Sequence, residues 1–223
     1  TVSSVTISSV TKKPWENKVL NITDYGQAGL PVIIGSNVTW ANATKALCAA
    51  MDAAADLGGG TVYFPRGTYF INTTYGLTIP WGVKLQGEDR SQVELIFSEF
   101  WEPSESPVAL FRGPEEGSGA WAISNLTIYT TSYHSNVIYV NNRTVGFEIT
   151  GTRVIANSFF GSNGVGTNRG ATQNITWAME APGPLLTIHS SQYIVRGNSF
   201  YSDGVVISST TAEALCPVQT GNT

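Results

Sequence analysis

The sequence predicts an all-β, turn-rich solenoid that is preceded by one short α-helix. Only 13% of its 223 residues are charged and 23 are Gly, a composition typical of short strands joined by tight turns. Apolar spacing of helical period occurs once, at 43–57, whereas strand-like runs follow from Thr61 onward. The runs at 153–160 and 194–201 share an Asn-Ser-Phe-aromatic pattern, and internal similarity of this kind is typical of stacked coils.

The segment at about 43–57 is expected to be the helix, because its apolar residues recur on one face. These residues are Leu47, Ala50, Met51, Ala54 and Leu57. Asn42 precedes the helix and can cap it through its side-chain oxygen, and Gly58–Gly60 ends it. We expect this helix to cover the open end of the first coil, where unpaired strand edges would otherwise invite aggregation.

Short strands are expected along the rest of the chain, at 61–64, 68–71, 77–79, 83–86, 93–97, 108–112, 120–129, 136–140, 145–150, 153–160, 184–189, 192–196 and 204–208. Coils bury one face of every strand, so inward positions should be large and apolar. The clearest inward candidates are Ile123, Leu126, Ile128, Val154, Ile155, Phe159, Leu186, Ile188, Ile194 and Phe200. The Asn before the aromatic residue in each repeat predicts a stacked turn, since Asn accepts a left-handed conformation. Longer loops should bulge out at about 98–119, 130–135 and 161–183.

The stretch Gly58–Ile71, GGGTVYFPRGTYFI, is followed at 77–88 by LTIPWGVKLQGE, and together they resemble the N-terminal entry of the pectate-lyase-like superfamily. The resemblance implies an all-β, single-stranded right-handed parallel β-helix with an N-terminal capping α-helix. Residues 21–223 would form this domain, and residues 1–20 an N-terminal extension or edge strand. The tail from Thr210 shows no evident cap, so the coils either end there or continue beyond the given C-terminus.

This resemblance is specific for the fold but not for the function, because the superfamily contains lyases, glycoside hydrolases, epimerases, tailspikes and non-enzymatic domains. The resemblance implies a polysaccharide or glycan as ligand, bound in a groove along the outside of one sheet. The first hypothesis is a lyase or glycoside hydrolase acting on a cell-wall or extracellular glycan. The alternative is a non-catalytic structural or adhesive glycoprotein that self-associates, and a glycan-binding module is a third interpretation.

The candidate catalytic residues are Asp203, Glu180 and His189, because acids and a histidine can move protons in glycan chemistry. The candidate substrate-binding residues are Arg196, Arg153 and Trp177. The two arginines hold nearby positions in the repeated pattern and could stack on one face to bind an anionic sugar. The competing interpretation is that both arginines and His189 are solvated surface residues, and that Trp177 packs on the scaffold. The polygalacturonase-type motifs are absent as a set.

No cofactor is expected, because no acidic cluster has recognisable metal-ligand spacing; Ca²⁺ enters only if the protein is a lyase. The net charge is -4 and the 12 Lys and Arg residues form no basic run, which argues against nucleic acid as a partner. No apolar run approaches the ~20 residues that a membrane-spanning helix needs.

Sequons for N-glycosylation occur at Asn21, Asn37, Asn42, Asn72, Asn125, Asn142 and Asn174. They predict a secreted, extracellular protein of a eukaryotic secretory pathway, whereas in a bacterial or viral β-helix they would be chance matches. Cys48 and Cys216 are expected to lie roughly 25–30 Å apart along the solenoid, given strands ~4.8 Å apart. A disulfide needs Cα atoms within about 7 Å, so no bridge between them is expected.

Overall fold

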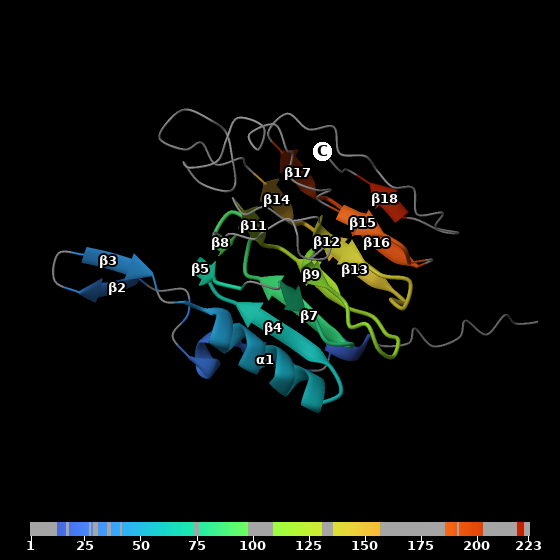
Figure 1. The fold of residues 1–223 in the computed structure, drawn as a ribbon, viewed down its shortest axis with the longest axis horizontal. Helices are drawn as coiled ribbons and strands as arrows, with labels where there is room; N and C mark the ends of the chain where they lie inside the picture. The colour runs from blue at the N-terminus through green and yellow to red at the C-terminus, as the bar shows by residue number, and fades with distance from the viewer. Residues whose placement is uncertain are drawn as a thin grey trace, which may run out of the picture.

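The computed structural model describes residues 13–16, 18–26, 28, 31–34, 37–40, 42–73, 76–97, 109–130, 136–156, 186–190, 192–202 and 218–220. Within these residues the chain winds repeatedly through three sheets whose neighbouring strands are parallel, as Figure 1 shows. Each full coil takes one strand from each sheet in turn, for example β7, β8 and β9. This arrangement is a parallel β-helix, and it confirms the predicted all-β solenoid.

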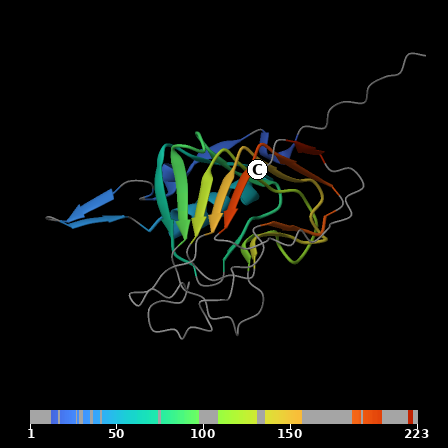
Figure 2. The ribbon, with the colours of Figure 1, turned by 90° about the horizontal axis from the view of Figure 1, so that it is seen from above.

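The first sheet has seven strands: β1 (Val19–Asn21), β4 (Gly60–Phe64), β7 (Val83–Gly87), β10 (Ala122–Ser124), β13 (Phe147–Thr150), β16 (Tyr193–Arg196) and β18 (Val218–Thr220). The second has five: β5 (Gly67–Ile71), β8 (Val93–Phe97), β11 (Thr127–Thr130), β14 (Arg153–Ala156) and β17 (Ser199–Ser202). Figure 2 shows a row of such strands side by side. The third has four: β6 (Leu77–Thr78), β9 (Ala109–Arg112), β12 (Asn136–Val140) and β15 (Leu186–Ile188).

The interior of the coils is filled by stacked aliphatic rows. On the first sheet the register aligns Val62, Leu85, Ile123, Ile149 and Val195, and each is at most 2% exposed. Burying each such side chain contributes about 1.5–3 kcal/mol, so one row alone is a large share of the folding free energy. The second and third sheets close the core with their own inward residues, such as Ile128 and Phe111.

The helix α1 (Thr44–Asp56) covers the N-terminal end of the solenoid, where it packs against β4 and β7. Its predicted stripe is buried at Leu47, Ala50, Met51 and Ala54, and Asn42 Oδ1 accepts a hydrogen bond from Thr44 N at 2.9 Å. The prediction was wrong for Leu57, which is 50% exposed. Leu57 lies beyond the last helical residue, where the chain turns away through Gly58 and Gly59 at positive φ.

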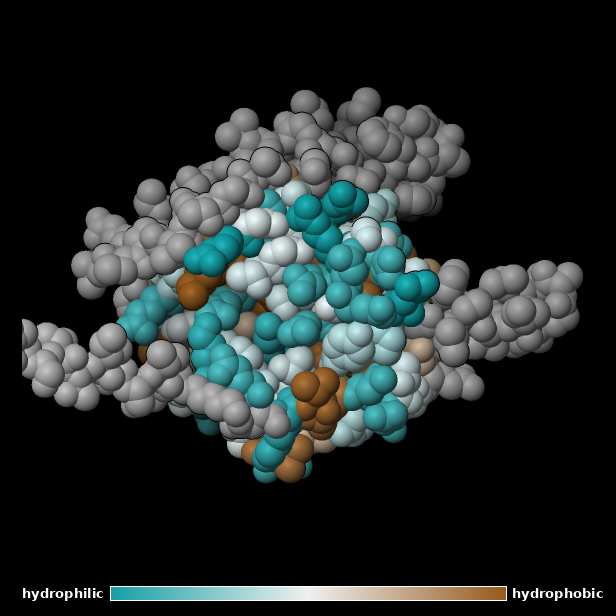
Figure 3. Space-filling view, turned by 180° about the vertical axis from the view of Figure 1, so that it is seen from behind, coloured by the Kyte–Doolittle hydropathy of each residue, from teal (hydrophilic) through white to brown (hydrophobic). Residues whose placement is uncertain are grey.

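Several other elements lie outside the three sheets. Short 3-10 helices cover Pro14–Glu16 (η1) and Ile22–Tyr25 (η2), and β2 (Pro31–Ile34) pairs with β3 (Asn37–Trp40) as an antiparallel hairpin. Helix α1 has 13 residues, and the described part of the chain holds no helix long and apolar enough to cross a membrane. The face shown in Figure 3 is largely hydrophilic, with apolar atoms in separate spots.

The turn between the first and second sheets is tight, and it splits the strand expected at 120–129 into β10 and β11. Asn125 takes the predicted left-handed conformation there, with φ 55, while glycines hold the same conformation in the next coils, at Gly151 (φ 59) and Gly197 (φ 63). The repeated Asn-Ser-Phe pattern gave the wrong register, because Arg153 pairs with Ser199 and not with Ile194. Asn198 instead reaches back, and its Oδ1 accepts from Thr152 N at 2.9 Å.

The inward positions were predicted correctly for Ile123, Leu126, Ile128, Val154 and Ile188, which are all buried. Four of the predicted inward residues are only half-buried in the structure: Ile155, Leu186, Ile194 and Phe200. Ile194 aligns with Glu148, a half-buried residue of the outer face, so the period-2 alternation was read one residue out of phase there. Phe159 and the strand expected at 204–208 lie outside the described residues.

Candidate functional site

The outer face of the third sheet carries a row of polar side chains. The register aligns Thr78 with Arg112, and Arg112 with Tyr139. Their strand neighbours Phe111 and Ile138 are fully buried, so alternation turns Arg112 and Tyr139 outward. Arg112 Nε donates to Thr78 Oγ1 at 3.3 Å, which orients the guanidinium along the sheet.

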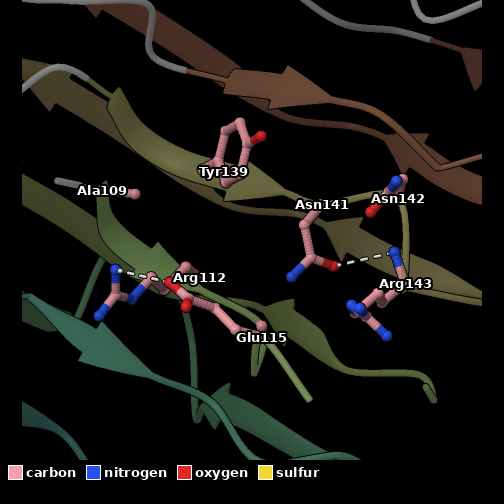
Figure 4. Close-up of a pocket in the computed structure, with 8 residues that line it drawn as sticks. Ala109, Arg112, Glu115, Tyr139, Asn141, Asn142 and Arg143 are labelled. Atoms are coloured by element: carbon pink, nitrogen blue, oxygen red, sulfur yellow. Dashed lines mark hydrogen bonds and ion pairs between the residues drawn. The ribbon is translucent and has the colours of Figure 1, made fainter. Parts of the chain in front are cut away.

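A cleft of about 250 Å³ lies over this row. It is lined by Ala109, Arg112, Gly113, Glu115, Tyr139, Asn141, Asn142 and Arg143. Two loops form its rim: loop 113–121, which follows β9, and loop 141–146, which follows β12. Figure 4 shows Arg112 and Arg143 at opposite sides of the cleft with Asn141 between them.

The two rim loops are fastened to each other by the side chain of Asn141. Its Nδ2 donates to Pro114 O at 2.8 Å, across to the neighbouring loop. Its Oδ1 accepts from Thr144 Oγ1 at 3.0 Å and from Arg143 N at 3.2 Å, within its own loop. Thr144 is 2% exposed, and its carbonyl accepts from Ser190 Oγ at 2.8 Å. These bonds link three successive coils, so the rim is held as one unit.

Loop 113–121 is also held by Trp81, whose Nε1 donates a hydrogen bond to Glu116 O at 2.9 Å. The loop lies so close to this indole that a Cβ added to Gly119 would stand 2.8 Å from Trp81 Cβ. Only glycine permits that approach. The backbone that carries Glu115 is therefore fixed at the edge of the cleft.

The charges in the cleft are unevenly paired. Arg112 Nη1 lies 3.6 Å from Glu115 Oε1, in an exposed i,i+3 pair. Arg143 is exposed, and within the described residues no carboxylate forms an ion pair with it. The balance of fixed charge in the described cleft is therefore positive, which favours an anionic ligand.

His189 is the one predicted catalytic residue that the structure describes, and its ring lies beside that of Tyr139, which lines this cleft. It directly follows β15, its side chain is exposed, and its backbone N donates to Val140 O at 2.7 Å. Its ring centroid lies 5.5 Å from that of Tyr139, with the planes at 60°. Asp203, Glu180 and Trp177 lie outside the described residues.

The predicted stacking of Arg153 with Arg196 was wrong. Arg153 belongs to the second sheet, where it pairs with Thr127 and Ser199, whereas Arg196 belongs to the first sheet and pairs with Thr150. The repeated pattern suggested equivalent positions only because its register was misread. Both arginines are exposed, and their role in binding stays a prediction.

The sequence missed Arg112, Tyr139 and Asn141 as site residues. Arg112 and Tyr139 lie in strands, where an aromatic or an outward arginine attracts no notice, and Asn141 lies just after β12. The signal that could have found them is coil register. Residues at the end of one strand of a parallel sheet lie beside the ends of its neighbours, although they are far apart in sequence.

The donors available in the cleft do not fit a Ca²⁺ site. Calcium takes six to eight oxygen ligands that are mostly carboxylates and carbonyls. The described part of the cleft offers one carboxylate, Glu115, which faces Arg112. Across the described ranges, no three His, Cys, Asp or Glu side chains gather in a group that could hold a metal.

Four of the sequon asparagines are exposed: Asn42, Asn72, Asn125 and Asn142. Asn21 is half-buried, and its Oδ1 accepts from Thr23 N and Thr23 Oγ1. The side chain of Asn37 and all of Asn174 lie outside the described residues.

Cys48 is half-buried in α1, and burial raises the pKa of its thiol, as does the nearby Asp52. Cys216 lies outside the described residues.

The fold has counterparts among solved structures. The A-module of mannuronan C-5 epimerase AlgE4 from Azotobacter vinelandii matches 91% of this chain and 56% of its own, with 16% identity and a TM-score of 0.53. The AlgE6 A-module from the same organism gives the same coverage, 18% identity and a TM-score of 0.47. This chain therefore spans 56% of the length of each. No family model matches the sequence, and no curated protein does. At 16% identity the likeness to the AlgE4 A-module shows the fold alone, a parallel β-helix.

Proposed function

We propose that this protein acts on an anionic polysaccharide, by removing the proton α to a uronate carboxylate in the cleft on the third sheet. The observation that carries this proposal is the grouping of Arg112, Tyr139 and His189 on one outer face. A guanidinium, a phenol and an imidazole are a carboxylate binder and two proton carriers. The AlgE4 A-module, whose fold this chain shares, is named as a mannuronan C-5 epimerase, which supports the substrate class.

The proposed step follows from these three groups. The guanidinium of Arg112 binds the uronate carboxylate and spreads its charge, which makes the neighbouring C5–H bond more acidic. The imidazole of His189 takes the C5 proton, and the electron pair of that bond moves toward the carboxylate. Tyr139 then supplies a proton, either to C5 or to the departing O4. In the first case C5 is inverted when the proton reaches the face opposite the one that lost its proton. In the second case the C4–O4 bond breaks and a C4=C5 double bond forms.

Hydrolysis is less well supported by the described residues. Glycoside hydrolases generally need two carboxyl groups about 5–9.5 Å apart. The described part of the cleft supplies Glu115 alone, and that carboxylate faces Arg112. A hydrolase would need a further acid from outside the described residues, where Asp203 and Glu180 are the predicted candidates.

Exchange of the C5 proton is the measurement that tests the proposal. Polymannuronate, polyguluronate and polygalacturonate are each incubated with the protein in D₂O, with Ca²⁺ or with EGTA, and deuterium at C5 is read by NMR. If the outcome is inversion, we expect deuterium at C5 of at least one polymer; if the outcome is elimination, we expect ultraviolet absorbance of an unsaturated end. His189→Asn and Tyr139→Phe should each lower the exchange rate by about 10²–10⁴-fold. Tyr63→Phe, on the first sheet, is the matched control and should not. A folded protein that gives neither deuterium at C5 nor an unsaturated end on any of the polymers contradicts the proposal.

The second candidate is a secreted extracellular glycoprotein in which the β-helix is a scaffold. The exposure of Asn42, Asn72, Asn125 and Asn142 favours it, because each could carry a glycan without disturbing the core. The test is the intact mass of the natural protein before and after enzymatic removal of N-glycans, with light scattering to measure self-association. A mass loss would support secretion, whereas an unchanged mass would favour a bacterial or viral β-helix.

A further inference from the structure

We infer that Glu115 is an internal competitor for anionic ligands: its carboxylate occupies Arg112, so a ligand carboxylate must displace it in order to bind there. The inference rests on the proposed function, because it takes the cleft to be the binding site of an anionic saccharide. It assigns to Glu115 a part in how strongly the cleft prefers an anionic saccharide to a neutral one.

The ion pair between Arg112 and Glu115 is weak enough for a ligand to displace. The 3.6 Å between Arg112 Nη1 and Glu115 Oε1 exceeds the length of a good hydrogen bond, so the pair is mainly a Coulomb contact. The side chain of Glu115 is 81% exposed and that of Arg112 is 33% exposed. A displaced Glu115 carboxylate would therefore move from one hydrated position to another at little cost in free energy. Arg112 would exchange one carboxylate for another.

The backbone under Glu115 does not share this freedom. Trp81 Nε1 holds Glu116 O, and Asn141 Nδ2 holds Pro114 O, on either side of Glu115. The carboxylate is thus kept within reach of Arg112 whether or not a ligand is present, and competition requires only a rotation of the side chain. Figure 4 shows the Glu115 side chain directed toward the Arg112 guanidinium.

Arg143 provides the contrast within the same cleft. It has no ion-pair partner among the described residues, so a ligand carboxylate meets no internal competitor there. Glu115 should therefore weaken only the share of binding that passes through Arg112. A neutral saccharide, which does not need the guanidinium freed, should be insensitive to Glu115.

Calorimetric titration of a short oligouronate and of a neutral oligosaccharide of equal length tests the inference. The proteins are the unmodified chain, Glu115→Gln, Arg112→Gln and the double variant, with Glu116→Gln as the control. Glu116 carries the same charge, is exposed and does not line the cleft. Glu115→Gln should tighten oligouronate binding by about 1.4- to 5-fold relative to Glu116→Gln, the range of an exposed ion pair. The gain should vanish when Arg112→Gln is also present.

Equal effects of Glu115→Gln and Glu116→Gln would overturn the inference, because the change would then be a general loss of negative charge. Persistence of the gain in the Arg112→Gln background would overturn it too. In both cases the unmodified chain still binds the oligouronate, so the proposed function stands. If neither the unmodified chain nor Glu115→Gln binds the oligouronate, the proposed function fails and this inference fails with it.

Discussion

The ammonium of Lys13 pairs with the carboxylate of Glu148, and the two residues are 135 positions apart in the sequence. Glu148 lies on β13, in register with Ala122 and, one strand further, Lys84. Two residues after Lys13, Trp15 is 4% exposed and its carbonyl accepts from Thr61 Oγ1 at 2.8 Å. The segment 13–16 is therefore a strap across the outer face of the first sheet.

Breaking this pair should destabilise the protein. The Glu148 side chain is 14% exposed and that of Lys13 41%, so the pair lies between a surface and a buried ion pair. We expect Glu148→Gln to lower the free energy of unfolding by about 1–2 kcal/mol, measured by urea denaturation. Glu94→Gln is the control, since Glu94 is exposed on the second sheet, and it should change stability by less than about 0.5 kcal/mol. Equal losses in both variants would mean that the ion pair between Lys13 and Glu148 contributes nothing to stability.

Ionisation of Tyr69 should lower the free energy of unfolding at alkaline pH. Burial, then the nearby Tyr63 and Glu88, raise the pKa of this tyrosine from 10.0 to about 12, and its hydroxyl donates to Pro65 O at 2.7 Å. Because the folded-state pKa is raised, the stabilisation is fully present below about pH 10 and is lost as the pH rises toward 12. Tyr69→Phe lacks the hydroxyl and should cost about 1 kcal/mol at neutral pH. The difference in unfolding free energy between the two proteins should therefore shrink above pH 10 and reverse in sign by about pH 12, and a constant difference would contradict the assignment.

Gly119 should be intolerant of any side chain. A Cβ there would stand 2.8 Å from Trp81 Cβ, and the indole cannot retreat without losing its bond to Glu116 O. We expect Gly119→Ala to cost about 1–3 kcal/mol, measured by thermal unfolding. Gly58→Ala makes a useful comparison, because nothing lies within 4 Å of its Cβ and only its φ of +76 opposes alanine. That variant should lose about 1 kcal/mol and leave Trp81 fluorescence unchanged.

The elements of the fold could be predicted from local patterns, and the helix shows why. The stripe from Leu47 to Ala54 needs only neighbours a few residues away to be recognised, and it is buried as expected. The strands that open the coils, β4 and β5, follow from the same kind of local spacing of β-branched and aromatic residues. Where the prediction depended on a long-range register, as for Arg153 and Ser199, it failed.

The candidate site is an extreme case of that dependence. His189 was proposed because a histidine carries chemistry wherever it lies, but its partner Tyr139 belongs to the previous coil. Arg112 belongs to the coil before that. Coil lengths vary because the loops between strands vary, so no fixed period in the sequence brings these three residues together. Only the hydrogen-bonded register of the third sheet does so.

Asn141 should prove to be a positioning residue for the cleft. Its amide alone connects loop 141–146 to Pro114 through a side-chain hydrogen bond, and the same side chain holds Thr144 and Arg143 in place. Replacing it with Ala removes all three side-chain bonds but leaves β12 and β9 intact. We expect Asn141→Ala to fold, to lose about 1–3 kcal/mol of stability, and to weaken oligouronate binding several-fold without changing the catalytic rate at saturation.

Hydrogen exchange separates this role from a general loss of stability. In Asn141→Ala the amides of 113–121 and 141–146 should exchange faster. The exchange rates of the amides of β4 and β7 should change only as far as the global free energy of unfolding changes. Asn142→Ala is the matched control, because Asn142 is exposed at the same cleft and has no part in the rim bonds described above. If both variants loosen the two loops equally, the rim is held by its backbone contacts, such as Val145 N to Gly119 O at 2.7 Å, and not by Asn141.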